Sequence, residues 1–164
     1  IDKVVAEFVA SLWNGFENSF YGRVFRNERF EDFTSKISPE IWTSATEYIE
    51  VLKNDNFGAQ CFFDVQPDDT IEGNDVHTSV VWICFMLDLS KVYPTLTRQE
   101  ATEEAHRNAI QLVSGSPFII TGLVRGFEGF TSYYWGQDDQ ASADMHPHYC
   151  FRLNTELTYI NSNC

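Results

Sequence analysis

One stretch of the chain, Ser79-Val80-Val81-Trp82-Ile83-Cys84-Phe85-Met86-Leu87-Asp88-Leu89, decides the fold, because it is apolar at almost every position. Such a run predicts a strand that presents apolar side chains on both faces of a sheet. A helix at the start of the chain covers only one of these faces, so we expect the other face to need a further cover. Thr97-Arg98-Gln99-Glu100 opens a helix a few positions later, which gives the local order strand, turn, helix.

Length and composition indicate one globular domain, residues 1–164. A chain of 164 residues buries roughly 70% of the surface that its unfolded form exposes. Hydrophobic residues make up 43% and aromatic residues 15% of the chain, which is too many for a disordered protein. No uninterrupted apolar run approaches the ~18 residues of a membrane-spanning helix. The sequence therefore predicts a soluble protein with no membrane partner.

The charge balance limits the partners. The chain carries 24 acidic and 11 basic side chains and a formal net charge of −13. Tight binding to nucleic acid depends on Lys and Arg side chains that displace counterions from phosphates, and these are scarce here. A negative surface repels phosphates, so a polyanion passes it without adhering. The composition excludes a DNA clamp and is compatible with a surface that DNA slides past.

Residues 1–52 show two helical patterns separated by an irregular segment. Apolar residues recur every three or four positions in residues 1–13, which predicts an amphipathic helix that ends at Gly15. Residues 17–38 mix arginines with aromatic residues and predict an extended or turn-rich connector. A short second helix over residues 41–52 is expected after the cap Ser38 and Pro39.

Residues 60–89 predict a long hairpin. Residues 60–66 alternate as a strand does, and the apolar strand follows after an acidic connection, residues 67–75. The connection contains the carboxylates Asp68, Asp69, Glu72 and Asp75. Their spacing is not that of a twelve-residue calcium loop, so a solvated or lumen-facing acidic tip is the favoured interpretation.

The second half of the chain predicts a helix and two strands. Thr97 and Glu100 are placed for a capping box, and Gly115 follows the end of this helix. Residues 118–125 have the composition of a strand, and residues 126–144 form a loop rich in glycine and aromatic residues. Polar and apolar residues alternate over residues 148–159. Together the elements predict an α+β fold, with a mostly antiparallel sheet, a long hairpin and helices packed on one face.

The four cysteines are sparse and lack the paired spacing of a zinc site. They are Cys61, Cys84, Cys150 and Cys164. We expect reduced, mostly buried thiols. A disulfide between Cys61 and Cys84 is the alternative, if the hairpin places these two residues opposite each other.

The best candidates for metal chemistry are His146, His148 and Cys150. Imidazole and thiolate bind zinc well, but a site also needs a fourth donor and supporting hydrogen bonds. A solvated strand face that carries these residues is the favoured alternative. No nucleophile motif is present, since Ser114-Gly115-Ser116 lacks the strand and helix of a nucleophile turn. The sequence therefore predicts no metal, no cofactor and no enzymatic activity.

Aromatic residues crowd the loop of residues 126–144. They are Phe127, Phe130, Tyr133, Tyr134 and Trp135. Three interpretations are open: contact with a neighbouring subunit, a sugar stacked on Tyr134 and Trp135, or a loop that folds back over the core of its own domain.

The order of elements resembles that of the tail-terminator and tail-completion proteins at the neck of tailed bacteriophages. The matching pieces are residues 1–13, 60–89, 97–113 and 149–160, which cover most of the chain. The resemblance implies a virion structural protein of the tail or neck, assembled in the host cytoplasm. It would form a ring, usually hexameric, that terminates the tail or joins it to the head while DNA passes through without tight binding. Its partners would be identical subunits and neighbouring neck, portal-side or tail-tube proteins.

Under this hypothesis the carboxylates Asp68, Asp69, Glu72 and Asp75 face the lumen or a neighbouring subunit. Phe127, Tyr134 and Trp135 are the expected assembly anchors. Apolar area that one domain leaves uncovered would be buried in heterologous contacts around a ring. The alternatives are a carbohydrate- or protein-binding module that uses the aromatic loop and, less favoured, a metal-dependent enzyme.

Overall fold

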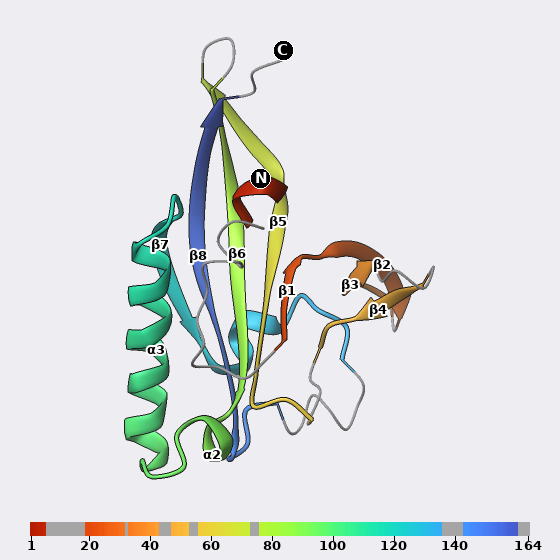
Figure 1. The fold of residues 1–164 in the computed structure, drawn as a ribbon. Helices are drawn as coiled ribbons and strands as arrows, with labels where there is room; N and C mark the ends of the chain where they lie inside the picture. Colours follow the sequence, from red (N-terminus) through yellow and green to blue (C-terminus); the bar gives the residue numbers. More distant parts are fainter. Residues whose placement is uncertain are drawn as a thin grey trace.

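A five-stranded central sheet and a three-stranded small sheet form the framework of the chain (Figure 1). The computed structural model describes residues 1–5, 19–31, 33–42, 47–52, 56–72, 76–135 and 143–160. Within these ranges the fold is α+β and its sheets are mostly antiparallel, as the sequence predicts. Residues 2–5 are helical, and the rest of the first predicted helix lies outside the described ranges.

The central sheet has the strand order β1-β5-β6-β8-β7. Its strands are β1 (Ser19–Arg23), β5 (Ala59–Glu72), β6 (Val76–Asp88), β7 (Ile119–Arg125) and β8 (His148–Ile160). Only β1 and β5 run parallel, and the other neighbours pair antiparallel. The predicted apolar strand is confirmed as β6, which lies at the centre of the sheet, and the predicted last strand is confirmed as β8, which the structure places next to β6.

The predicted hairpin is confirmed as β5 and β6, but its strands are longer than expected. Most of the acidic segment predicted as a connection belongs to β5, because pairing with β6 continues to Glu72. Three residues, Gln66 to Asp68, stand opposite Val80 alone, so a bulge interrupts the ladder. Pro67 lies in this bulge, where its missing N–H breaks no ladder hydrogen bond.

Helix α3 (Arg98–Ser114) packs on one face of the central sheet. Its predicted capping box is confirmed: Thr97 Oγ1 accepts from the Glu100 N–H at 3.4 Å, and the Thr97 N–H donates to Glu100 Oε2 at 2.9 Å. The short helix α2 (Leu89–Val92) links β6 to α3 and is capped by Asp88. No helix among the described residues is both long and apolar enough to span a membrane.

The first hydrophobic core lies between α3 and the central sheet. The helix contributes small buried side chains, Ala101, Ala105, Ala109 and Val113, which allow close approach to the sheet. The sheet contributes larger ones, including Phe63, Ile83, Phe85, Phe151 and Leu153. The rings of Phe85 and Phe151 stack across β6 and β8 with their centroids 4.8 Å apart.

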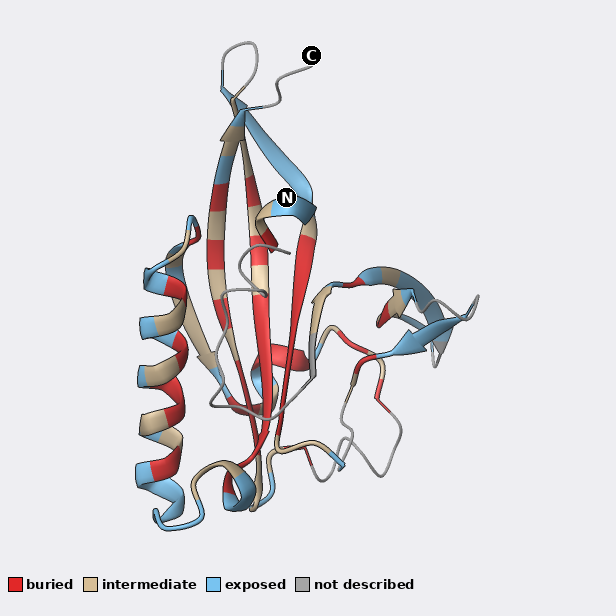
Figure 2. Cartoon of the chain, viewed as in Figure 1, coloured by how far each residue is buried: buried red, intermediate tan, exposed pale blue. Residues whose placement is uncertain are grey.

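The opposite face of β6 has a further cover besides the first helix, as expected, but this cover comes from the same chain and not from a neighbouring subunit. Cys84 and Met86 pack there against Phe130, Tyr133 and Trp135 in a second core. The segment after β7, including the 3-10 helix η1 (Gly126–Phe130), supplies these aromatic side chains. Figure 2 shows the result: the lower halves of β5 and β6 are buried on both faces.

The small sheet corrects two predictions for residues 17–52. It consists of β2 (Phe25–Glu31), β3 (Thr34–Trp42) and β4 (Tyr48–Glu50), where the sequence predicted a connector and a helix. Ile37 and Ile41 pack against the second core. Their burial, and a composition of β-branched and aromatic residues that suits strands, outweigh the weak helical spacing. Helices therefore lie on one face of the central sheet, and the small sheet helps to cover the other.

The three described cysteines, Cys61, Cys84 and Cys150, are buried free thiols. Cys61 pairs with Phe85 in the ladder, and Cys84 pairs with Phe62. Because successive residues point to opposite faces of a sheet, Cys61 and Cys84 lie on opposite faces. The hairpin register therefore separates these two thiols, and Cys164 lies outside the described residues.

Candidate assembly site

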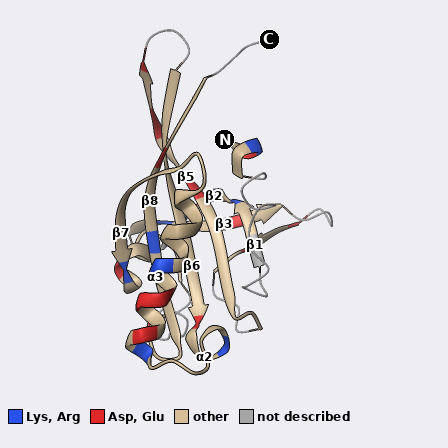
Figure 3. Cartoon of the chain, turned by 60° about the vertical axis from the view of Figure 1, so that its left-hand side comes forward, with Lys and Arg blue, Asp and Glu red and all other residues tan. Residues whose placement is uncertain are grey.

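The most unusual surface is the arm, defined as residues 66–72 of β5, 76–80 of β6 and 156–160 of β8. It extends beyond α3 and the small sheet as a three-stranded ladder (Figure 1). The described arm contains four carboxylates and no Lys or Arg: Asp68, Asp69, Glu72 and Glu156. In Figure 3 the arm shows acidic colour and no basic colour. The arm is therefore a purely anionic projection.

One carboxylate of the arm, that of the exposed Asp69, is held by hydrogen bonds to the neighbouring strands. Ser79 Oγ donates to Asp69 Oδ1 at 2.5 Å, and Tyr159 Oη donates to Asp69 Oδ2 at 3.1 Å. Tyr159 also stacks on His77, with ring centroids 5.5 Å apart. Asp69 thus ties β5 to β6 and β8, and its side chain is not a free surface charge.

Two other carboxylates of the arm point outward. Asp68 and Glu72 are exposed, and neither forms a hydrogen bond or ion pair with another described residue. Two large aliphatic side chains accompany them: Ile71 is 61% and Ile160 is 70% exposed. Asp75, the fourth predicted acidic residue, lies outside the described ranges. The end of the arm thus combines negative charge with branched aliphatic surface.

Both edges of the arm lack a partner strand among the described residues. Pairing between β1 and β5 stops at Phe63, and pairing between β7 and β8 stops at Glu156. Exposed strand edges invite pairing with another chain, and prolines, bulges and charges protect against uncontrolled pairing. Pro67, the bulge and the adjacent carboxylates provide such protection on the β5 edge.

An open pocket of ≈ 450 Å³ lies at the root of the arm, where β5 leaves the cover of β1 and β2. Its lining combines apolar side chains with polar and charged ones of both signs: Ile1, Val24, Phe25, Val65 and Pro67, and Arg23, Arg26, Gln66, Asp69 and Tyr159. Arg23 Nη1 donates to Asp2 Oδ1 at 3.0 Å in an exposed pair. Arg26 Nη1 donates to Gln66 Oε1 at 2.8 Å. The root of the arm therefore combines apolar surface with arginines whose charges face nearby carboxylates and amides.

Asp64 forms a buried polar centre below this pocket. Its side chain is fully buried and accepts from Tyr133 Oη at 2.7 Å and from Arg26 Nη1 at 3.4 Å. Burial raises the pKa of the Asp64 carboxyl, against the lowering effects of the Tyr133 hydrogen bond and the Arg26 charge. Tyr133 Oη also lies 3.5 Å from Cys84 Sγ. The cluster joins β2, β5 and the segment after η1, and its inaccessibility favours a structural role.

The aromatic loop folds back over the core of its own chain, which is one of the three interpretations that the sequence left open. Trp135 is only 8% exposed, and its Nε1–H donates to the Phe130 carbonyl at 3.2 Å. Phe127 is partly buried, with its ring centroid 5.4 Å from that of Trp135. Tyr134 is partly buried and lies under Arg29, 5.4 Å from the guanidinium carbon. The loop therefore presents little free aromatic area for a sugar or a neighbour.

Exposed aromatic rings occur instead on the small sheet, where the sequence pattern did not place them. Phe25, Trp42 and Tyr48 are 55%, 54% and 51% exposed. Their rings form one group, with centroids 5.4 Å apart for Phe25 and Tyr48 and 5.0 Å apart for Trp42 and Tyr48. Only the pairing of β2, β3 and β4 brings these positions to one face.

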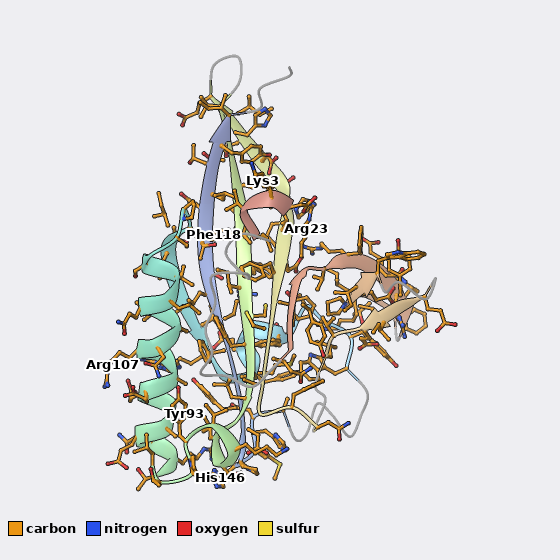
Figure 4. The ribbon with its side chains drawn as sticks, in the orientation of Figure 1. Lys3, Arg23, Tyr93, Arg107, Phe118 and His146 are labelled. Carbon is orange, nitrogen blue, oxygen red and sulfur yellow. The ribbon has the colours of Figure 1, made fainter. Side chains whose placement is uncertain are left out.

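The candidate metal ligands do not assemble. His148 and Cys150 share one face of β8, as their spacing predicts, but Cys150 is buried and its pKa is raised to about 12 by burial and by Asp144. A protonated thiol is a poor zinc ligand. His146 is exposed in the turn before Pro147 (Figure 4). No group of three His, Cys, Asp or Glu side chains that could hold a metal occurs in the described part of the chain.

No family model, curated protein or solved structure matches this chain. Inferences about its function therefore depend on its own surface and on the order of its elements.

Proposed function

We propose that this protein is a virion structural subunit that assembles into a ring at the neck of a tailed bacteriophage, where it terminates the tail or joins it to the head. The observation that carries the proposal is the arm, a paired ladder that projects from a well-packed body and bears four carboxylates without a cation. Identical subunits, six as is usual in the proteins that it resembles, would surround the DNA, with neck, portal-side or tail-tube proteins above and below.

Self-association is supported by the apolar surface that the chain leaves exposed. The small sheet and the turn between β2 and β3 expose six large apolar side chains: Phe25, Phe30, Phe33, Trp42, Tyr48 and Ile49. Aromatic residues in such numbers are typical of protein interfaces. A ring of heterologous contacts lets each copy present one such surface to the next.

Passage of DNA is supported by the charge of the arm. Charges of one sign on a narrow projection repel phosphates over about a Debye length, ~8 Å at physiological salt. Arms that point toward the axis of a ring would therefore keep DNA from adhering to the channel. The formal net charge of −13 acts in the same direction.

Light scattering of the purified protein tests the assembly. We expect a particle several times heavier than the 18.9 kDa chain, and its mass should fall on dilution. A species that stays monomeric at high concentration, also after addition of neck, portal-side or tail-tube proteins, contradicts the proposal.

A charge reversal on the arm tests the channel role. Asp68→Lys with Glu72→Lys should leave the fold intact and make assembled particles retain double-stranded DNA in a salt-dependent way. The matched control is Glu103→Lys with Glu128→Lys, which changes the net charge equally at exposed sites off the arm. Equal DNA retention by the two variants would show that the arm does not line the channel.

A binding module is the second candidate, because the exposed group of Phe25, Trp42 and Tyr48 offers rings on which a sugar or a peptide can stack. Trp42→Ala should then abolish retention on a glycan array or peptide column and leave the particle mass unchanged. Loss of particle mass in the same variant would assign these rings to assembly instead.

A further inference from the structure

The buried face of α3 contains a single polar side chain. Its buried residues are Ala101, Ala105, His106, Ala109 and Val113. His106 is the largest of these, and only 4% of it is exposed. Each alanine buries one methyl group and therefore contributes little hydrophobic free energy. His106 is thus a main contact between α3 and the central sheet.

The surroundings of His106 suit a neutral ring. Its Nε2 lies 2.8 Å from Tyr149 Oη of β8, and its ring packs edge-on against Phe151, with centroids 4.9 Å apart. Its Nδ1 is buried, and no described residue forms a hydrogen bond with it. A neutral imidazole that donates from Nε2 leaves only a lone pair unsatisfied at Nδ1. An imidazolium has two N–H donors, so protonation would bury a charged donor at Nδ1 without an acceptor.

The charged groups near His106 come from three elements. Tyr149 faces it from β8, Arg125 acts from the end of β7, and Glu103 acts from the preceding turn of α3. Burial has the largest effect on the pKa of His106 and lowers it; the charge of Arg125 lowers it further, and that of Glu103 raises it. An imidazole released into water titrates near 6.5, so a proton favours the state in which His106 is exposed.

We propose that His106 is a pH-sensitive switch for α3: when its imidazole gains a proton, the helix leaves the central sheet while the strands stay paired. The ladder of β5, β6 and β8 contains no residue of α3, and neither does the second core on the opposite face. Both can therefore persist during a local opening. This switch does not depend on ring assembly, so its failure leaves the proposed function to its own test.

Hydrogen exchange measures the opening. An isolated helix of 17 residues is only marginally stable in water, so the amides of α3 should exchange once it leaves the sheet. After correction for intrinsic exchange rates, the opening constant of α3 should rise between pH 7.5 and pH 5. The limit is roughly thirtyfold, for a histidine of pKa about 6.5 that binds its proton only in the open state.

Reporters on the rest of the fold separate local from global opening. The amides of β6 should stay protected at both pH values. The buried thiols Cys84 and Cys150, which belong to the second core, should stay unreactive toward a pyridyl disulfide reagent. Loss of protection in β6 together with labelling of these thiols overturns the switch, because the whole chain then unfolds.

Two variants test the role of the imidazole. His106→Gln keeps a polar side chain that does not titrate, so exchange in its α3 should not depend on pH. Arg125→Gln removes a nearby positive charge at an exposed position and should move the opening to lower pH. Wild-type exchange that does not change with pH, or that changes equally in His106→Gln, overturns the switch. If His106→Gln does not fold, Arg125→Gln decides, and an opening pH that does not fall overturns it.

Discussion

The body, which is the described chain outside the arm, shares the strands β5, β6 and β8 with the arm. The same types of interaction are buried in the body and exposed to water in the arm. In each region an aspartate of β5 accepts a hydrogen bond from a tyrosine of another segment. In the body, Tyr133 Oη donates to Asp64 at 2.7 Å, and both side chains are buried. In the arm, Tyr159 Oη donates to Asp69 at 3.1 Å in an exposed setting. A buried hydrogen bond that loses a partner leaves an unsatisfied group, whereas water replaces a lost partner at the surface.

The comparison shows that pairing of strands continues where the core ends. Covered on both faces, β6 is a core strand over residues 81–88. Past α3 and the small sheet it becomes a surface strand without a break in its pairing with β8. The body therefore supplies the folding free energy and holds the arm in place. Within the arm Leu157 and Ser79 are still buried, so its base belongs to the core, whereas the exposed end with Ile71, Glu72 and Ile160 contributes little to folding and is free to serve assembly.

The largest expected effect is a cavity in the body. Ile83 is fully buried in the core between α3 and the central sheet. Ile83→Ala should lower the free energy of unfolding by about 2–5 kcal/mol, because the surrounding side chains cannot fill the space. Denaturant titration measures this loss. A loss below about 1 kcal/mol would mean that the body is not packed as tightly as its burial indicates.

The two tyrosines provide the next test. Tyr133→Phe removes a donor from the buried Asp64 carboxyl and should lower the free energy of unfolding by about 1–3 kcal/mol. Tyr159→Phe removes the equivalent donor from Asp69 and should cost less than about 0.5 kcal/mol. Both are measured by urea titration at neutral pH. Equal losses would break the distinction between body and arm.

A smaller effect concerns the pH dependence of stability and a histidine on the buried face of α3. His106 is buried, its Nε2 lies 2.8 Å from Tyr149 Oη, and no described residue partners its Nδ1. Burial, together with the charge of Arg125, lowers the pKa of His106 below its ordinary value of 6.5. The unfolded chain then binds a proton more readily than the folded one, so stability should fall as pH drops below about 6.5.

His106→Gln removes the titrating group and should flatten this part of the pH profile. Thermal unfolding between pH 7 and pH 5 compares the two proteins. His77→Gln in the arm is the matched control, because its ring is partly exposed and stacks on Tyr159. A profile that flattens only in the His77 variant would move the pH sensitivity from the body to the arm.

The smallest expected effect is at the end of the arm. Ile71→Ser changes an exposed side chain and should alter the free energy of unfolding of the monomer by less than about 0.5 kcal/mol. Its effect should appear in assembly, measured by light scattering as a weaker dependence of mass on concentration. A large loss of monomer stability would show that the arm belongs to the folding core.

The local sequence predicted a helix or strand correctly where the contacts or the side-chain period that define it lie within that element. Thr97 and Glu100 cap α3 through contacts within one turn, so their spacing predicts the helix start correctly. The apolar run from Ser79 predicts β6, and alternation predicts β8, because both depend on side-chain period alone. Residues 41–52 were predicted wrongly as a helix, since Trp42, Tyr48 and Ile49 pair across strands that only the tertiary fold brings together.

The candidate site was predictable in part. The acidic residues are visible in the sequence, and Asp68 and Glu72 are exposed on the arm. Asp69 has the same side chain but is held by Ser79 and Tyr159, and nothing in its spacing distinguishes it. The root pocket combines residues from four distant segments, so no local pattern announces it.

By itself the sequence determined the α+β class, the central apolar strand, the capped helix and a surplus of carboxylates, because composition and short-range periodicity carry these properties. Tertiary structure alone decided that the second face of β6 is covered from within, that the aromatic loop is core, and that exposed rings gather on the small sheet. The physical reason is that a surface is buried only when a second surface covers it. Residues far apart in the chain must meet before either surface is removed from water.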